Sequence, residues 1–213
     1  MRSSFWKGLI VVGLIAAWAG NALAAGELDI VPFAGYRWGG SLSTIPGVKK
    51  FDVQDNWNYG VAIDKQVSQE AAAELYYSHF SSDWDATLSA GNTKLSSNFN
   101  RDDIELNGLW FAYRPGQDTR PYFTAGLGTS VFSSDATETV WRFAWNIGAG
   151  VRKDINPKTA LRVEGRWHPT WVTTGSSAFC DPFYGCYSVG TGESFDQFDV
   201  TLGLAYRLGG RQR

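Results

Sequence analysis

The sequence contains few of the residues on which metal-dependent or disulfide-rich proteins depend. Two cysteines and two histidines occur among 213 residues. Zinc sites take four ligands, mostly from these two residue types and from carboxylates. A zinc site at the cysteines would need two further ligands close by. We therefore expect no metal and no cofactor.

A basic excess is also missing. The chain has 19 lysines and arginines against 21 aspartates and glutamates, and its formal net charge is −2. Domains that bind nucleic acid carry a basic patch or stripe, so nucleic acid is not an expected partner. After the first 25 residues, no apolar run reaches the roughly 18 to 20 residues of a transmembrane helix.

The first 25 residues predict a secretory signal peptide. Arg2 and Lys7 give a basic start, an apolar run extends from Gly8 to Ala19, and Ala22-Leu23-Ala24 offers the small residues that signal peptidase recognises. The alternative, a membrane-anchoring helix, is disfavoured because the apolar run is too short.

Residues 26–213 have no helical periodicity of useful length and are predicted to form one domain. In LRVEGRWH (Leu161–His168), apolar or small residues alternate with residues that can carry charge. A period of two is the period of a β-strand. Eight such segments predict strands at 28–38, 56–64, 70–80, 103–114, 121–132, 140–152, 159–171 and 195–208. The alanine-rich segment 70–80 would also fit a short helix.

The predicted connections alternate in length. Long connections lie at 39–55, 81–102 and 172–194, and short turns lie at 65–69, 115–120 and 153–158. In an up-and-down antiparallel sheet, alternate connections lie at opposite ends. Outer-membrane barrels have this asymmetry, with short periplasmic turns and longer extracellular loops.

The apolar strand faces are predicted to point outward into lipid. In the last strand Phe198, Val200, Leu202, Leu204 and Tyr206 share one face. A soluble barrel would turn this face inward and would have to pack many of the 10 tryptophans into a small core. On a lipid-facing surface, the aromatic residues would instead form belts at the two membrane interfaces. The predicted belt tryptophans are Trp57, Trp110, Trp141, Trp167 and Trp171.

The opposite faces are predicted to enclose a network of paired charges. An unpaired buried charge costs several kcal/mol, and the guanidinium group of arginine can bind two acceptors at once. The predicted acidic members are Asp29, Asp64, Glu74, Glu105, Glu164 and Asp199, and the predicted basic members are Arg37, Arg142, Arg152, Arg162, Arg166 and Arg207. The alternative is that half of these charges lie on the surface.

Three segments of the second half resemble a known family. They are RPYFTAGLGTSVF (120–132), FAWNIGAGVRKDINPKTALRVEGRW (143–167) and FDVTLGLAYRL (198–208). They resemble the small eight-stranded outer-membrane β-barrels, the OmpA-like transmembrane domain and its relatives. The first half matches by pattern only. Such barrels often end on an aromatic residue, whereas here GGRQR follows Leu208.

The pattern and the resemblance together imply an all-β, eight-stranded, antiparallel, up-and-down transmembrane barrel in a Gram-negative outer membrane. Side chains fill the lumen of a barrel of this size, so no wide pore is expected. We expect a monomer in contact with outer-membrane lipid. Its expected role is structural or interactive, through the long extracellular loops, and not enzymatic.

The two cysteines, Cys180 and Cys186, predict a disulfide. An exported chain reaches an oxidising compartment, whereas zinc would need two further ligands nearby and His79 and His168 are the only histidines. Closing a loop this short would stabilise the folded state by about 2 kcal/mol in the chain-entropy model, because it lowers the entropy of the unfolded chain.

Two alternative functions and one alternative metal site compete with this interpretation. His168-Pro169-Thr170 resembles the His-x-Ser of outer-membrane lipid A deacylases, but threonine replaces the serine, Pro169 disturbs the strand and His168 shares parity with the interior charges. A soluble secreted barrel with a small ligand is the second. The third is a loop calcium site at Asp83, Asp85, Asp102 and Asp103, which lack the dense ligand spacing of such sites.

Overall fold

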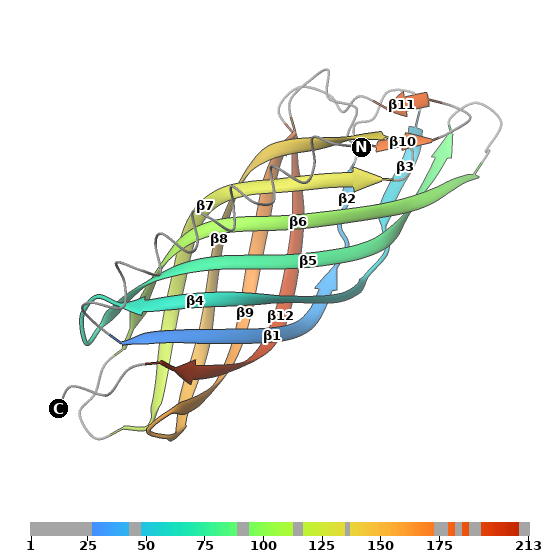
Figure 1. The fold of residues 1–213 in the computed structure, drawn as a ribbon. Coiled ribbons are helices and arrows are strands. Elements are labelled where there is room, and N and C mark those ends of the chain that lie inside the picture. The colour runs from blue at the N-terminus through green and yellow to red at the C-terminus, as the bar shows by residue number, and fades with distance from the viewer. Residues whose placement is uncertain are drawn as a thin grey trace, which may run out of the picture.

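The chain forms a closed, eight-stranded antiparallel β-barrel (Figure 1). The computed structural model describes residues 27–42, 48–88, 94–112, 117–134, 137–172, 179–181, 185–187 and 193–208. The barrel strands are β1 (Leu28–Trp38), β4 (Asn56–Gln66), β5 (Ala71–Leu88), β6 (Lys94–Phe111), β7 (Thr119–Ser134), β8 (Thr137–Asn156), β9 (Thr159–Val172) and β12 (Glu193–Arg207). Within these residues, no helix is long and apolar enough to cross a membrane.

Antiparallel pairing runs around the whole barrel. β1 pairs with both β4 and β12, and β6 pairs with both β5 and β7, which closes the sheet. The alanine-rich segment is part of a strand and not a helix. β1 begins and β12 ends at the same end of the barrel (Figure 1). This is the end of the short turns, and we call it the periplasmic end; the opposite end is the outer end.

Two short strands extend the barrel at its outer end. They are β2 (Ser41–Leu42) and β3 (Val48–Val53). β4 pairs with the first part of β5, and β3 pairs with its outer part, where Val53 lies opposite Trp84. The chain bends between β1 and β2 at Gly40, whose φ is +85°. A Cβ at Gly40 would overlap the carbonyl oxygen of Asp196, so glycine suits this bend for two reasons.

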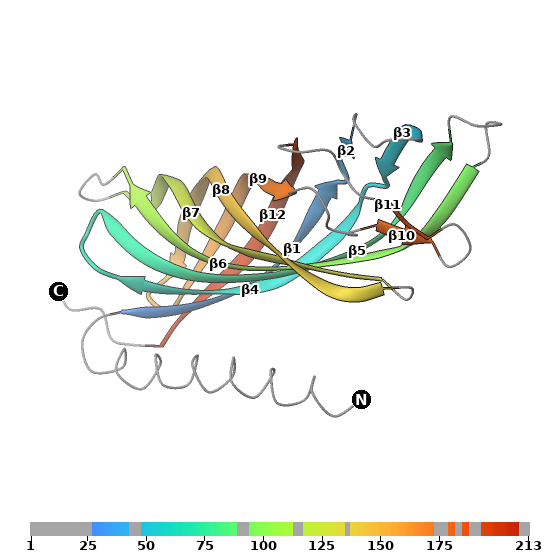
Figure 2. The ribbon, with the colours of Figure 1, turned by 90° about the horizontal axis from the view of Figure 1, so that it is seen from above.

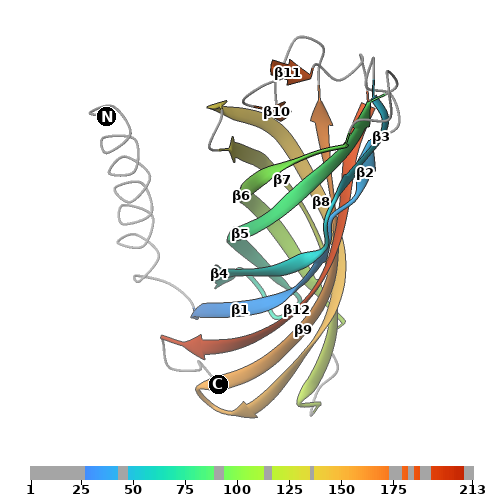
Figure 3. The same ribbon diagram turned by 90° about the vertical axis from the view of Figure 1, so that its right-hand side faces the viewer.

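The long loops predicted at 39–55 and 81–102 are wrong for much of their length. β2 and β3 occupy part of the first, while β5 and β6 continue through most of the second. Their Ser, Asp and Asn residues indicated loops, but a strand that rises above a membrane also turns polar side chains to water. In the third predicted loop, 172–194, β10 (Phe179–Asp181) and β11 (Gly185–Tyr187) form a hairpin. It lies near the outer ends of β5 and β6 (Figures 2 and 3).

The polarity of the two sheet faces reverses along β5. In its first half Glu74 points into the barrel and Leu75 points outward, whereas further out Trp84 is buried inside and Asp83 and Asp85 are exposed outside. The apolar residues that are buried on the interior side at this end are defined as the outer apolar core: Phe51, Val53, Phe80, Trp84, Phe132 and Phe195. The barrel is therefore lined with charge in its middle and with apolar side chains at its outer end.

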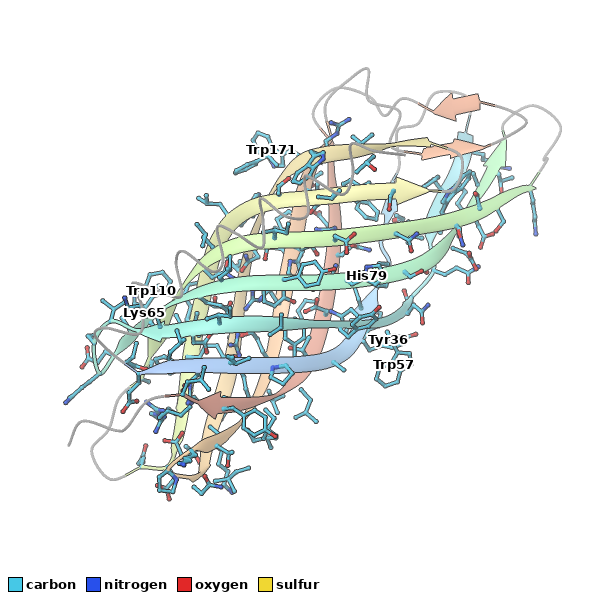
Figure 4. The ribbon with its side chains drawn as sticks, viewed as in Figure 1. Tyr36, Trp57, Lys65, His79, Trp110 and Trp171 are labelled. Carbon is cyan, nitrogen blue, oxygen red and sulfur yellow. The ribbon has the colours of Figure 1, made fainter. Side chains whose placement is uncertain are left out.

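Exposed aromatic side chains gather toward both ends of the apolar outer surface. Trp57 and Tyr36 lie toward the outer end, and Trp110 lies toward the periplasmic end (Figure 4). Trp57 is 67% exposed and Leu202 is 55% exposed. Apolar side chains this open on a strand are expected of a lipid-facing surface and would be costly in water.

Candidate functional site

The barrel interior contains a network of buried ion pairs, and its outer part centres on Arg37 of β1. Arg37 donates hydrogen bonds to Asp103 of β6 at 2.7 Å and to Asp199 of β12 at 2.8 Å. Asp103 also accepts a hydrogen bond of 2.7 Å from Arg101, whose guanidinium donates to Gln197 as well. Each arginine thus uses its planar fork to join residues from different strands.

The inner part of the network centres on Arg162 and Arg166 of β9. Arg166 donates to Glu164 at 2.7 Å and to Glu74 of β5 at 2.9 Å. Arg162 donates to Glu164 at 2.6 Å and lies 3.3 Å from Asp64 of β4. Because β9 is opposite β4 and β5 in the barrel order, these pairs cross the lumen and do not run along its wall.

His168 connects the two parts. Its Nε2 lies 3.3 Å from Asp199 of the outer part, and its Nδ1 lies 3.4 Å from Glu105. Glu105 also accepts a hydrogen bond of 2.8 Å from Asn146 of β8. Charged and polar contacts therefore continue along the interior from Arg37 to Arg162.

The periplasmic end of the interior carries its own ion pairs. Arg152 lies 2.6 Å from Asp29, and Arg207 lies 3.3 Å from Glu27 and 3.5 Å from Asp29. These residues occupy the rim where β1 begins and β12 ends.

Arg142 is the one predicted network residue that the structure places elsewhere. It is partly exposed at the outer end of β8 and donates to the carbonyl oxygen of Trp141 at 2.9 Å. Among the residues that the structure describes, no carboxylate lies within ion-pair distance of it. Its parity places it on the interior side, but its guanidinium turns back to the backbone of its neighbour Trp141.

Two network residues, Arg101 and Asp103, were missing from the predicted set. Arg101 fell within a predicted loop, and Asp103 was grouped with the loop aspartates. In the described part of the chain, seven buried carboxylates face five buried arginines and His168, and Arg207 pairs with Asp29 at the rim. The signal that would have found both residues is their odd parity, which they share with Glu105 along β6.

The four aspartates of the calcium hypothesis do not lie together, because they are on different faces of the sheet. Asp103 points into the barrel, whereas Asp102 points outward and Asp83 and Asp85 are exposed on the outer surface. The described residues contain no group of three or more histidine, cysteine or acidic side chains arranged to hold a metal.

The His168–Thr170 pair does not reach the lipid. Both side chains are fully buried inside the barrel, where Thr170 Oγ1 lies 3.4 Å from Ser130 Oγ. A lipid substrate would approach from the opposite face of β9. The structure therefore does not favour a deacylase site at this position.

The interior arrangement is suited to holding strands together. A Cβ at Gly126 would overlap the side-chain amide of Asn107, so a glycine leaves space there for a polar neighbour. Tyr122 donates a hydrogen bond to Glu164 and accepts one from Arg162 at 2.7 Å. Glycines leave space for long polar side chains, and these side chains fill the cross-section of the barrel with ion pairs and hydrogen bonds.

The two cysteines lie opposite each other in the outer hairpin. Cys180 of β10 is the direct ladder partner of Cys186 of β11. Directly opposed residues of an antiparallel pair have Cα atoms about 4.5 to 5.5 Å apart, within the range of a disulfide. The disulfide itself stays a prediction.

Together, an apolar belted exterior and an enclosed charged interior define a transmembrane β-barrel. A family model, outer membrane protein beta-barrel domain, matches residues 10–207. The chain therefore belongs to this outer-membrane β-barrel family, and its location is the bacterial outer membrane.

Solved structures have the same fold. The crystal structure of neisserial surface protein A aligns with a TM-score of 0.56 at 11% identity, covering 85% of this chain and 97% of that chain. OprG from Pseudomonas aeruginosa aligns with a TM-score of 0.61 at 13% identity, covering 87% and 97%. At such identities the likeness concerns the fold alone. A comparison with curated proteins finds no match.

Proposed function

We propose that this protein is a non-enzymatic barrel that presents a rigid interaction surface outside the outer membrane. The barrel anchors the chain in lipid, and the outer parts of β3, β5 and β6 form the presented surface. The outer hairpin that carries Cys180 and Cys186 belongs to the same end. A disulfide there would reduce the entropy lost when the hairpin is ordered on binding.

The observation that carries this proposal is the polarity reversal along β5. Above the aromatic belt, polar residues such as Asp83, Asp85 and Asn98 face outward while Trp84 packs inside against Phe51, with ring centroids 5.4 Å apart. Sheets with one apolar and one polar face are stable in water. This supports an ordered surface that projects beyond the headgroups and does not depend on flexible loops.

The proposal includes a closed lumen, and the network of buried ion pairs supports this. Cross-lumen pairs such as Arg162–Asp64 and Arg166–Glu74 occupy the middle of the barrel, and the outer apolar core lies above them. We expect no steady conductance when the purified protein is inserted in a planar bilayer.

Site-specific photo-cross-linking on intact cells tests the interaction role. A photoreactive amino acid at Asp85 or Asn98 is expected to yield discrete adducts with molecules at the cell surface. Lys158, in the periplasmic turn between β8 and β9, is the matched control and should yield none of the same mass. The absence of adducts at both outer positions would contradict the proposal.

A further inference from the structure

A polar and aromatic patch lies on the outward surface where β4, β5 and β6 leave the apolar band. It is defined here as the outer-interface patch: Trp57 and Tyr59 of β4, His79 and Ser81 of β5, and Asn100 and Asp102 of β6. Ladder pairing arranges it in rows, because Tyr59 lies opposite His79 and His79 lies opposite Asp102. In the next row outward, Ser81 lies opposite Asn100.

Asp102 organises the patch. One of its oxygens, Oδ1, lies 2.7 Å from His79 Nδ1 and accepts a hydrogen bond of 2.9 Å from Tyr77 Oη. Two donors on one oxygen reduce the cost of a carboxylate beside lipid. The His79 ring lies 5.3 Å from the Tyr59 ring. Asp102 thus fixes an imidazole against an aromatic ring.

The position of the patch along the barrel axis determines which part of the membrane it contacts. Below it the outward surface is apolar, with Leu106 at 55% exposed, and above it Asp83 and Asp85 face water. Figure 4 shows His79 about midway along β5, nearer to Tyr36 and Trp57 than to Trp110. Outward side chains at this level lie among the headgroups of the outer leaflet.

The chemistry of the patch suits a sugar better than a phosphate. Tyr59 and Trp57 are 59% and 67% exposed and offer flat apolar faces on the β4 side. Ser81, Asn100 and the carboxylate of Asp102 offer donors and acceptors for hydroxyl and amide groups on the other side. The patch contains no lysine or arginine, so it lacks the groups that usually bind phosphate.

We propose that the outer-interface patch binds the sugar headgroup of an outer-leaflet glycolipid, with a ring of the sugar against the aromatic residues and its hydroxyl or amide groups on Ser81, Asn100 and Asp102. This inference rests on the proposed membrane-anchored surface role and names one partner for that surface. The occupant is a lipid-anchored sugar, because the lower edge of the patch adjoins the apolar band.

Native mass spectrometry of the full chain, released from detergent micelles, tests the site. The probes are lipid A from which the phosphates have been removed, so that it presents an uncharged glucosamine disaccharide, and phosphatidylglycerol, which is anionic and has no sugar. We expect the wild type to bind lipid A at least about tenfold more tightly. A Ser81→Ala/Asn100→Ala variant, which loses about two hydrogen bonds, should bind lipid A roughly tenfold less tightly and leave phosphatidylglycerol binding unchanged.

Two single variants give the matched comparison. Asp102→Asn should weaken lipid A binding about fivefold, the effect of one or two weakened hydrogen bonds. Asp196→Asn, an exposed outward residue on β12, should change lipid A binding by less than about twofold, since it lies outside the patch. If Asp102→Asn fails to fold, as judged by heat-modifiable gel migration, the double variant carries the test.

Equal affinity of the wild type for the two lipids would overturn the inference, as would equal effects of Asp102→Asn and Asp196→Asn. Neither result affects the cross-linking at Asp85 and Asn98. Loss of lipid A selectivity with intact cross-linking therefore rejects the patch alone, whereas the reverse pattern rejects the broader surface role.

Discussion

Arg166 shows how a full charge is stabilised inside this barrel. Its guanidinium binds Glu74 and Glu164 and lies 4.1 Å from the centroid of the Tyr76 ring. Both the carboxylates and the aromatic face contribute electrostatic stabilisation. Removing the arginine would leave two buried acidic groups, Glu74 and Glu164, to share the guanidinium group of Arg162.

We expect Arg166→Met to lower the free energy of unfolding by about 3–5 kcal/mol, because it removes one of the two buried guanidinium groups that neutralise Glu74 and Glu164. Urea unfolding of the barrel in lipid vesicles measures this. Arg142→Met is the matched control, and its cost should stay under about 1 kcal/mol since Arg142 has no carboxylate partner in the described chain. Equal costs for the two variants would contradict the assignment of the network.

A substitution at Leu202 tests whether the outward face of the strands contacts lipid. Its side chain is 55% exposed in the middle of β12. We expect Leu202→Arg to cost about 2–4 kcal/mol, the penalty for arginine near the bilayer midplane. Asp85→Arg, above the membrane, should cost less than about 0.5 kcal/mol in the same vesicle titration. A negligible cost at Leu202 would mean that this face does not meet hydrocarbon.

At the scale of the element, the outer extension is stabilised by its own apolar core. Trp84 of β5 is 1% exposed and stacks on Phe51 of β3. We expect Trp84→Ala to destabilise the extension by about 3–5 kcal/mol while the membrane-embedded part stays folded. Hydrogen exchange should then accelerate in β3 and the outer half of β5 and stay slow around Glu74. Uniform acceleration through all strands would show that the extension is not a separate stability unit.

The outer hairpin carries a second prediction at this scale. We expect Cys180 and Cys186 to be joined, so the unreduced, denatured protein should take up no maleimide. Reduction should add about two daltons, one hydrogen for each sulfur, and should then permit two maleimide additions. Thiol labelling before reduction would reject the disulfide.

The sequence predicted β1 to the residue and predicted that β5 is a strand, because alternation persists where one face is buried. It failed at the outer strand ends. There, Ser, Asp and Asn around Asp83 and Asn98 indicated loops, although the period of two continues with reversed polarity. Composition alone does not show that water has replaced lipid outside the barrel and apolar side chains have replaced charges within it.

The network was predicted from parity, and parity explains both its success and its errors. Parity assigns Arg37 and Glu164 to the interior correctly but says nothing about which partner a side chain takes, and Arg142 binds the carbonyl oxygen of Trp141 in place of a carboxylate. The partners across the lumen, such as Arg37 with Asp103, depend on which strands face each other after closure. That information belongs to the three-dimensional barrel and not to any single strand.

At the scale of the whole molecule, the chain contacts three environments, which are the lipid, the water outside the membrane and the enclosed interior of the barrel. Its middle zone turns apolar residues outward to lipid and encloses ion pairs, and its outer zone turns polar residues to water over an apolar core. The aromatic belts mark the boundary between lipid and water. The proposed functions both lie at or above that boundary, on β3, β4, β5 and β6, while the middle zone provides the anchor.

The most direct measurement of this orientation is methyl NMR of the protein in nanodiscs, with nuclear Overhauser contacts to lipid acyl chains. The methyl groups of Val200 and Leu202 should show such contacts, and that of Ala205, which faces the interior, should show none. Contacts between Val200, Leu202 and Ile147 across a dry centre, with Arg162 and Glu164 in exchange with bulk water, would contradict the account.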